Sequence, residues 1–393
     1  MRVLHLLDTI DPAGAGPVEA ARLYCMAARH DYCPEVLSLD HNVDQWRRSW
    51  PVPVHAVGRS RLLPRYSPAL VPWLRENGSR FDAIVVHSVW GYHLVGAWRA
   101  LRPNVPYFLI LHGALNPWFR NAYPLKHLKK GAFWWALIDK AVAGAKAVFY
   151  LCHEEKRIAD PAFSIRSPGE AFVPLGTLPR RRSPEPFLER FPSLRGKRIL
   201  LFLGRICYMK GCDILLDAFA EAVAESTSGA HLVICGTDHE QWQATLIQRA
   251  ERLGIADRVT WIGPLFGDDR WPAMSAAELL VLPSRCDTFP IVVLEALSCG
   301  TPVLVTREVN IHPQIEETSA GLVCEASQGD VASAIRTWLA HSVAEREAFA
   351  ERAAKCHLRN FDLRRVVEIH LEAIRKNLLA SRKESIESIR AGA

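Results

Sequence analysis

The 393-residue sequence lacks the features that mark secreted, disulfide-bonded or membrane-spanning proteins. Its ten cysteines are scattered singly with no C-x-x-C pair, so we interpret them as reduced, mostly buried thiols. The opening MRVLHLL is too short for the apolar core of a signal peptide. The longest apolar candidate, residues 131–152, carries Asp139, Lys140 and Lys146, which argues against a membrane span. These absences predict a cytoplasmic protein.

Motifs for metals and for repeats are also missing. No D-x-D motif stands in a loop after a predicted strand, and the acidic pair Asp268-Asp269 is followed at once by Arg270. No short-period repeat is visible. We therefore expect no metal site and no bound cofactor.

Acidic residues are scarce between His41 and Trp135, where 13 Lys and Arg stand against three Asp and Glu. Eight of the 12 tryptophans fall in the same stretch. Basic residues mixed with tryptophan suit an anionic lipid surface. They also suit nucleic acid, or a solvated basic surface over a tryptophan-rich core, and composition alone leaves these interpretations open.

The length favours two domains, and the segment patterns repeat in both halves. Apolar runs typical of buried strands alternate with helical stretches, which predicts parallel sheets covered by helices. The expected strands are Val3–Leu7, Val36–Leu39, Ala83–His87, Tyr107–Leu111 and Ala147–Leu151, then Ile199–Leu203, Leu232–Cys235, Val259–Ile262, Leu279–Leu282 and Val303–Val305. The clearest helices are Pro17–Arg29, Leu125–Ala143, Cys212–Ala224, Glu240–Leu253, Ile291–Ser298 and Leu363–Leu379.

The fold class is therefore α/β, with two tandem Rossmann-like domains and a cleft between them. Residues 1–178 form the first domain, and the polar, proline-rich residues 179–196 form a linker. Residues 197–362 form the second domain, and 363–393 a final helix with a charged tail. In such sheets, ligands bind at the carboxyl ends of the strands.

The segment from Leu282 to Thr306, LPSRCDTFPIVVLEALSCGTPVLVT, carries the strongest functional signal. It predicts a loop, a helix, a tight turn and a strand, with Asp287 in the loop and Glu295 eight positions later on the helix. The spacing resembles the E-x7-E signature of retaining GT-B glycosyltransferases, and the surrounding residues resemble glycosyltransferase family 4. The resemblance covers nearly the whole chain and is strongest over 198–325.

The resemblance implies roles for this segment. Asp287 and Phe289 would lie at the donor sugar, and Glu295 would bind the ribose of the nucleotide. The backbone of Ile291 and Val292 would face the diphosphate. Here Asp287 stands where the family usually has Glu, and Pro290 where it has Gly, so the identity of the sugar is the property most affected.

Two cations flank the next expected loop. Gly204-Arg205 ends the first strand of the second domain, and Lys210-Gly211 opens the following helix. A nucleoside diphosphate needs cationic partners as charge builds on its β-phosphate during transfer. The pair also resembles the family's diphosphate-binding Arg and Lys. Gly236 and Gly263 follow later strands, where they either line a base pocket or only form turns.

The first half offers weaker candidates. Gly14 and Gly16 follow the first strand, where small residues let backbone N–H groups approach an anion. His112 follows a buried-looking strand and resembles the family's sugar-contacting histidine. His87 also ends a strand and is the next candidate. Residues 173–177 resemble the family's V-P-N-G segment, to which we assign a structural role on the hinge side.

Taken together, the resemblance implies a retaining hexosyltransferase of the GT-B fold that uses a UDP- or GDP-sugar and needs no metal. It implies a last helix that packs on the first domain. Residues 112–130 look like those of bacterial enzymes that build exopolysaccharide, lipopolysaccharide or O-antigen on lipid-linked acceptors. This predicts a peripheral contact with the inner membrane and no nucleic acid. The alternatives are a tandem-Rossmann epimerase or phosphorylase, and an inactive basic scaffold that binds nucleic acid or membrane.

Overall fold

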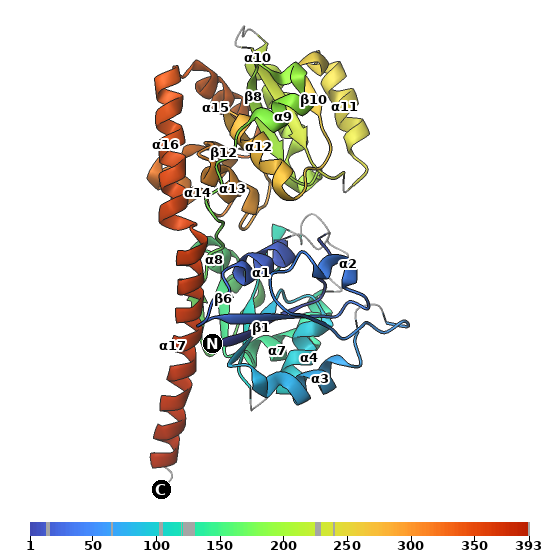
Figure 1. Cartoon of the computed structure of the whole chain (residues 1–393), viewed down its shortest axis with the longest axis vertical. Coiled ribbons are helices and arrows are strands. Elements are labelled where there is room, and N and C mark those ends of the chain that lie inside the picture. The colour runs from blue at the N-terminus through green and yellow to red at the C-terminus, as the bar shows by residue number, and fades with distance from the viewer. Residues whose placement is uncertain are drawn as a thin grey trace. The chain divides into compact units, whose positions relative to one another are not determined.

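The computed structural model describes residues 1–12, 16–63, 66–101, 105–118, 120, 130–224, 229–238 and 240–391, with side chains to 379. The chain divides into two compact units. The first comprises Met1–Gly176 together with Leu363–Ala393, and the second comprises Thr177–Asp362. Each unit has its own parallel sheet and its own covering helices (Figure 1).

The first unit is built on a seven-stranded sheet in the order β3-β2-β1-β4-β5-β6-β7. All neighbouring strands are parallel. The strands are β1 (Arg2–Leu7), β2 (Cys33–Ser38), β3 (Val54–Ala56), β4 (Ala83–His87), β5 (Tyr107–Ile110), β6 (Ala147–Tyr150) and β7 (Glu170–Phe172). The chain reverses its direction of travel across the sheet between β1 and β4, so the switch point lies between these two strands.

Helices cover both faces of this sheet. Figure 1 shows α1 on one side of the strands and α3, α4 and α7 on the other. The helical segments are α1 (Gly16–Met26), α2 (Asp44–Arg47), α3 (Leu70–Asn77), α4 (Tyr92–Leu101), a π-helical turn (Trp134–Ile138), α7 (Asp139–Ala143), α8 (His153–Phe163) and α17 (Leu363–Ala391). Because the central strands are covered on both sides, every residue of β4, β5 and β6 is buried.

The last helix, α17, belongs to the first unit. Four of its aliphatic side chains are fully buried, namely Val366, Val367, Leu371 and Ile374. Arg29, just beyond α1, pairs with Glu368 of α17 at 2.5 Å. The helix continues to Ala391, into the segment that the sequence predicted as a charged tail.

The second unit has a six-stranded parallel sheet in the order β10-β9-β8-β11-β12-β13. Its strands are β8 (Arg198–Leu203), β9 (Ala230–Cys235), β10 (Val259–Trp261), β11 (Leu279–Leu282), β12 (Val303–Thr306) and β13 (Gly321–Cys324). The switch point here lies between the adjacent strands β8 and β11.

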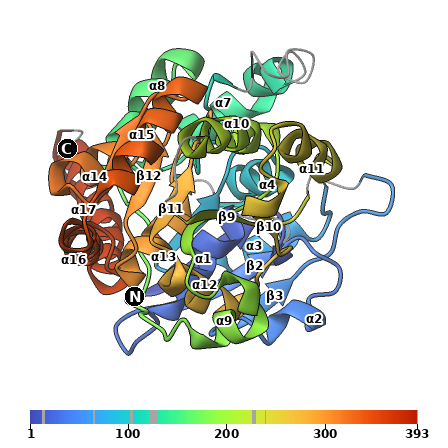
Figure 2. The same ribbon diagram turned by 90° about the horizontal axis from the view of Figure 1, so that it is seen from above.

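Helices again form two layers. Figure 2 shows α10, α11 and α15 on one side of the strands and α9, α12 and α13 on the other. The helices are α9 (Glu185–Arg190), α10 (Cys212–Val223), α11 (Gln243–Arg252), α12 (Arg270–Ala276), α13 (Ile291–Cys299), α14 (His312–Thr318), α15 (Gln328–Ala340) and α16 (Val343–Asn360). The outermost helices, α15 and α16, pack against α10 and α13 respectively.

The predicted fold class is confirmed, because both halves are Rossmann-like parallel sheets. The three strands that the sequence pattern missed, β3, β7 and β13, all lie at sheet edges. Segment 179–196, expected as a linker, contains α9, and its Phe187 is buried in the second unit. The predicted helix at Leu125–Ala143 lies partly outside the described residues, which show the π-helical turn and α7 in its second half.

All ten cysteines are free thiols, and eight of them are buried, as the isolated spacing predicted. No helix among the described residues combines the length and the apolar character that a bilayer crossing requires.

Candidate donor site

The switch point of the second sheet brings together two of the predicted site residues. Lys210 ends the loop after β8, and Asp287 lies in the loop after β11. The Lys210 Nζ donates to Asp287 Oδ2, and both side chains are largely buried. A cation and an anion that follow adjacent strands thus meet at the carboxyl edge of the sheet, where ligands bind in this fold.

Backbone geometry makes this meeting possible. Gly211 has a φ of +70°, and a Cβ there would lie 2.0 Å from the carbonyl oxygen of Pro283. Only glycine fits so close an approach in that conformation. The loop after β8 therefore lies directly against the loop after β11, which sets Lys210 opposite Asp287.

Asp287 is also held by its own backbone. Its N–H donates to the carbonyl oxygen of Glu308 at 2.9 Å, and its carbonyl oxygen accepts from the N–H of Asn310 at 2.9 Å. These bonds tie the loop after β11 to the loop after β12. The carboxylate is consequently fixed in place from two directions.

An arginine that sequence reasoning missed joins the same two loops. Arg285 forms a bidentate ion pair with Asp213, through Nη1 at 2.8 Å and Nη2 at 2.7 Å. Its Nη1 also donates to the carbonyl oxygen of Tyr208 at 2.8 Å, and its guanidinium lies 3.9 Å from the centre of that ring. The sequence holds no signal for this pairing, because 72 residues separate Arg285 from Asp213.

Arg205 lies two residues beyond the end of β8 and is half-buried. The loop around it is fixed, since Gly204 N–H donates to the Cys235 carbonyl oxygen and Ile206 N–H to that of Thr237. Within the described part of the chain its guanidinium has no acidic partner. It therefore differs from Lys210, whose charge is already matched by Asp287.

Glu295 lies on the predicted helix, α13, and is buried with 4% of its surface exposed. Arg270, the first residue of α12, pairs with its Oε1 at 2.6 Å. The sequence did not indicate this partner. A buried carboxylate needs a matching charge, and Arg270 supplies it while fixing the orientation of the carboxylate.

The remaining residues of the predicted motif lie around the start of α13. Pro290 precedes the helix. Ile291 and Val292 lie in its first turn, and their side chains are half-buried. Their backbone N–H groups precede the first regular helical hydrogen bonds. Phe289 is buried and packs edge-on against Phe361, at 5.9 Å between ring centres.

The glycine candidates divide into three kinds. Gly236 follows β9, and its N–H donates to the carbonyl oxygen of Gly263 beyond β10. Gly16 is the first residue of α1. Gly14 lies outside the described residues.

The sequence pattern does not predict Asp268 and Asp269 as metal ligands. In the structure Asp268 pairs with Arg180 at 2.7 Å, and Asp269 lies 3.7 Å from Arg190.

His112 belongs to the first unit, just after β5. It has a φ of +55°, and its Nε2 is 2.9 Å from Nδ1 of His87, the second histidine candidate. Glu155 holds the loop, since its Oε1 accepts from Gly113 N–H at 2.5 Å and its Oε2 from Leu151 N–H at 2.6 Å. Burial raises the pKa of Glu155 to about 7 and lowers the pKa of His112 to about 3.

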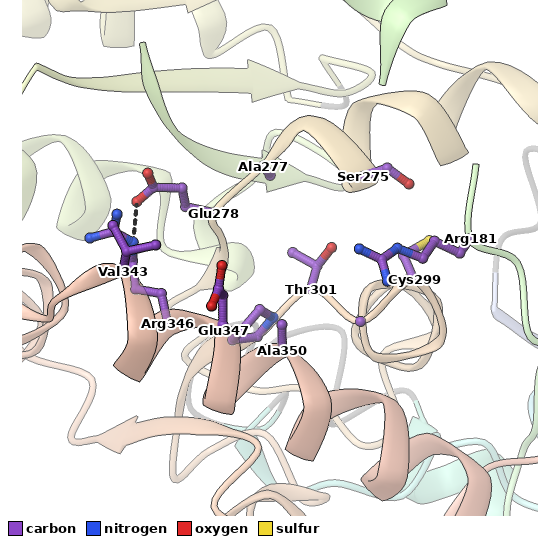
Figure 3. Close-up of a pocket in the computed structure, with 12 residues that line it drawn as sticks. Arg181, Ser275, Ala277, Glu278, Cys299, Thr301, Val343, Arg346, Glu347 and Ala350 are labelled. Atoms are coloured by element: carbon purple, nitrogen blue, oxygen red, sulfur yellow. Dashed lines mark ion pairs between the residues drawn. The ribbon is translucent and has the colours of Figure 1, made fainter. Parts of the chain in front are cut away.

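A separate hollow of about 220 Å³ lies in the second unit. Figure 3 shows Glu278 and Arg346 paired at its rim and Arg181 beside Cys299. Glu278 immediately precedes β11 and Pro302 immediately precedes β12, so the hollow opens at the amino ends of the strands. It is therefore distinct from the site at the carboxyl ends.

Comparison with known families agrees with this geometry. A family model described as glycosyl transferases group 1 matches residues 187–356, and one described as a glycosyl transferase 4-like domain matches residues 14–176. The chain belongs to the family 4 type of glycosyltransferases. Each of its two sheets thus lies largely within one of the two matched models.

The curated relatives of this glycosyltransferase match it over only part of their own length. The D-inositol 3-phosphate glycosyltransferase of Salinispora tropica is 32% identical over 179 residues, which is 43% of this chain and 36% of the relative. The mannosylfructose-phosphate synthase of Agrobacterium fabrum is 33% identical over 114 residues, 28% of this chain and 25% of the relative. The matched stretches thus span between a quarter and little more than a third of these relatives' own length.

Solved structures confirm the GT-B fold over the whole glycosyltransferase chain. Anabaena HepE, crystallised with UDP, has a TM-score of 0.77 at 19% identity, over 96% of this chain and 100% of that one. WaaG, a glycosyltransferase involved in lipopolysaccharide biosynthesis, has a TM-score of 0.70 at 19% identity, over 95% and 99% of the two chains. At this level of identity the likeness concerns the fold alone.

Proposed function

We propose that the protein is a retaining glycosyltransferase that moves a hexose from a UDP- or GDP-sugar to a glycan or lipid-linked acceptor. The observation that carries the proposal is the meeting of Lys210 with Asp287 at the switch point. Arg205 lies in the same loop as Lys210, and its guanidinium has no acidic partner among the described residues. HepE was crystallised with UDP and with UDP-glucose, which supports UDP as the first nucleotide to test.

The diphosphate is the part of the donor that the site suits best. Arg205 can donate two parallel hydrogen bonds to phosphate oxygens, and Lys210 adds a second positive charge close by. Both cations would stabilise the charge that grows on the β-phosphate as the glycosidic bond breaks. The N–H groups of Ile291 and Val292 at the start of α13 would add to this field.

The two acids have separate roles in the proposal. Glu295, oriented by Arg270, would accept hydrogen bonds from the ribose hydroxyls. Asp287 contacts the hexose, and His112 of the first unit donates to one of its oxygens. Lys210 is paired with Asp287 in the structure. A bound diphosphate would therefore share the Lys210 ammonium group with the Asp287 carboxylate.

We propose that the transfer needs no divalent metal, since the two cations can take over leaving-group stabilisation. Turnover in EDTA should then equal turnover in magnesium. Loss of turnover in EDTA that returns with magnesium would contradict this part of the proposal.

We further propose that the acceptor belongs to bacterial exopolysaccharide or lipopolysaccharide synthesis, at the cytoplasmic face of the inner membrane. Large apolar side chains are exposed on the first unit, among them Leu62, Leu63, Phe133, Trp135 and Leu137. Most other tryptophans of the basic stretch are packed into or against the core, including Trp50, Trp73 and Trp134. The exposed set suits an interfacial contact.

Liposome flotation tests the membrane contact. The protein should float with vesicles that contain anionic lipid and should remain unbound with neutral vesicles or at high salt. The double variant Leu62→Ser with Trp135→Ser should float less. Equal flotation with both vesicle types would contradict the electrostatic part of this contact.

The transfer itself is tested by incubating the full chain with UDP- and GDP-hexoses, with and without a lipid-linked glycan acceptor. The expected result is release of nucleoside diphosphate only with acceptor, and a product whose anomeric configuration matches that of the donor. Conversion of the donor sugar without any acceptor would favour the epimerase. Absence of turnover and of nucleotide binding would favour the scaffold.

A further inference from the structure

Three histidines of the first unit form one hydrogen-bonded chain. His5 lies on β1, His87 ends β4, and His112 follows β5, so they come from three neighbouring strands. His5 Nδ1 is 2.9 Å from His87 Nε2, and His87 Nδ1 is 2.9 Å from His112 Nε2. At the far end, His5 Nε2 is 2.9 Å from the hydroxyl of Tyr32.

Strand register explains why the rings meet. His5 pairs with Val85 and His87 with Ile110 in the parallel ladders. Since side chains alternate along a strand, His5 and His87 face the same side of the sheet, with His112 continuing the same parity beyond β5. Tyr24 of α1 and His370 of α17 stack together at 4.5 Å over that face and cover His5.

Burial keeps the histidines of this hydrogen-bonded network neutral. His5, His87 and Tyr32 expose no more than 1% of their surface. Burial lowers the pKa of His5 and His87 far below the usual value, with His370 and the neighbouring histidines adding to the effect, and lowers the pKa of His112 to about 3. Each ring thus has one N–H donor and one bare nitrogen acceptor.

Only two arrangements of protons satisfy every hydrogen bond of the network from Tyr32 to His112. In the first, the Tyr32 hydroxyl donates to His5, His5 to His87, and His87 to Nε2 of His112, which leaves the proton of His112 on Nδ1. In the second, every bond is reversed and His5 donates to Tyr32. The Tyr32 hydroxyl would then need another acceptor, and the described residues provide none. Leaving a buried donor unpaired costs about 1–3 kcal/mol.

We propose that Tyr32, His5 and His87 are positioning residues that hold His112 as the Nδ1–H tautomer. The Nδ1 of His112 makes no hydrogen bond with any described residue, and the side chain is half-buried, so this nitrogen is open to a ligand. His112 therefore presents a fixed hydrogen-bond donor to an oxygen of the substrate, which, as a statement about a sugar, rests on the proposed function.

The surrounding backbone is set to aim the ring. The carboxylate of Glu155 binds the N–H of Gly113, next to His112. On the other side, the His93 Nε2–H donates to the carbonyl oxygen of His87 at 2.8 Å. The backbone positions of His87 and His112, which share the last hydrogen bond of the network, are consequently fixed, and only the placement of protons remains to be selected.

Nitrogen-15 NMR of the full chain, labelled at histidine, reads the tautomer directly. In wild type without ligand, the His112 signals, assigned by their loss in His112→Gln, should show a protonated Nδ1 and a bare Nε2. A protonated Nε2 would overturn the proposal, whatever the protein transfers. This measurement needs no substrate, and it does not depend on whether variants of Tyr32, His5 or His87 fold.

Tyr32→Phe supplies the second arm. Removing the hydroxyl takes away the preference between the two arrangements, so the His112 signals should shift toward a mixture of tautomers. Tyr107→Phe is the matched control, because Tyr107 is equally buried and donates at 2.5 Å to the Ala141 carbonyl oxygen, away from the histidines. It should leave the tautomer unchanged, and an equal shift in both variants would contradict the proposal.

The consequence for the sugar is measured separately. In Tyr32→Phe, the KM for an accepted nucleotide sugar should rise about tenfold, the effect of weakening one hydrogen bond. The affinity for the free nucleoside diphosphate should stay as in wild type. A correct tautomer with an unchanged KM would remove the role in sugar binding, whereas failure of all nucleotide binding would instead count against the proposed function.

Discussion

At the scale of single residues, the site depends on charges that are buried and matched. Lys210 with Asp287, and Arg270 with Glu295, each place two opposite charges where little water reaches them. Removing one partner of a buried ion pair is strongly destabilising, because the other charge is left uncompensated. A pair of the same length on the surface contributes little.

Arg270→Ala should therefore lower the free energy of unfolding by about 3 kcal/mol, as measured by urea denaturation. The matched control is Arg359→Ala, whose partner Glu317 is also 2.6 Å away but whose pair has side chains 60% and 58% exposed. That change should cost less than about 1 kcal/mol. Similar losses in both variants would show that the burial of Glu295 is not compensated by Arg270.

Glu155 predicts a dependence of stability on pH. Its pKa of about 7 in the folded protein lies above the usual 4.5, so the folded state keeps a proton that the unfolded chain has lost over that interval. The free energy of unfolding should then fall as pH rises from about 4.5 to about 7. A difference of one in pKa corresponds to about 1.4 kcal/mol, which gives a fall of about 3 kcal/mol.

The measurement is the pH profile of unfolding for wild type and Glu155→Gln. The free-energy difference between them should change by about 3 kcal/mol across this interval, in the sense that wild type loses stability as pH rises. Glu317→Gln, at an exposed carboxylate, should give a curve parallel to wild type. A Glu155→Gln curve that is also parallel to wild type would show that the pKa of Glu155 is not raised in the folded protein.

At the scale of elements, close approach of strands decides which residues fit. A Cβ on Gly236, at the end of β9, would lie 1.7 Å from the carbonyl oxygen of Gly204 at the end of β8. The obstacle is backbone, so no rotamer change can relieve it. The role of Gly236 in packing the strand ends together is thus sufficient to require glycine.

Gly236→Ala should lower the free energy of unfolding by about 3 kcal/mol or more. Gly329→Ala is the control, because Gly329 lies near the start of α15, where an added Cβ would meet no atom within 4 Å. Alanine is the better helix former there, so stability should be unchanged or slightly higher. A mild effect at Gly236, seen by urea denaturation, would show that β8 and β9 can move apart.

The sequence predicted the elements well where their pattern was strong. The central strands are continuous apolar runs, and these were identified in both halves. β3 and β7 were missed because they are three-residue edge strands without such runs. The sequence placed Lys210 and Asp287 each in a loop at the carboxyl end of a strand. Only the structure shows that β8 and β11 are neighbours and that the two side chains pair.

Pairings between distant residues could not be predicted in this way. Arg270 is 25 positions from Glu295, and nothing in either local pattern indicates that α12 presents its first residue to α13. The same holds for the chain from Tyr32 to His112, which depends on the register of three strands. The contact of the Phe289 ring with Phe361 was likewise not indicated by the sequence.

At the scale of the whole molecule, the two ends of the sequence belong to one unit. The buried side chains of α17 stabilise the first unit although the second unit stands between them in the sequence. Truncation after Asp362 would remove four fully buried aliphatic residues, each worth about 1.5–3 kcal/mol. That sum approaches the whole stability of an ordinary domain.

We therefore expect a chain that ends at Asp362 to lose the first unit selectively. Limited proteolysis should degrade the segment 1–176 quickly while a fragment from the second unit persists. A chain that ends at Leu379 retains the buried contacts and should resist like wild type. Equal resistance of the two truncated chains would show that α17 is dispensable for the first unit.

The central claim is that Arg205 and Lys210 bind the diphosphate of a nucleotide sugar at the switch point of the second sheet. The most direct measurement is the thermal shift of wild type and Arg205→Ala across a panel of UDP- and GDP-sugars. A ligand at a hundred times its Kd stabilises the folded state by about 2.7 kcal/mol, so at least one should raise the Tm of wild type. The same ligand should have little effect on Arg205→Ala, whose Tm without ligand stays near that of wild type. No shift with any sugar nucleotide, or an equal shift in both proteins, would contradict the account.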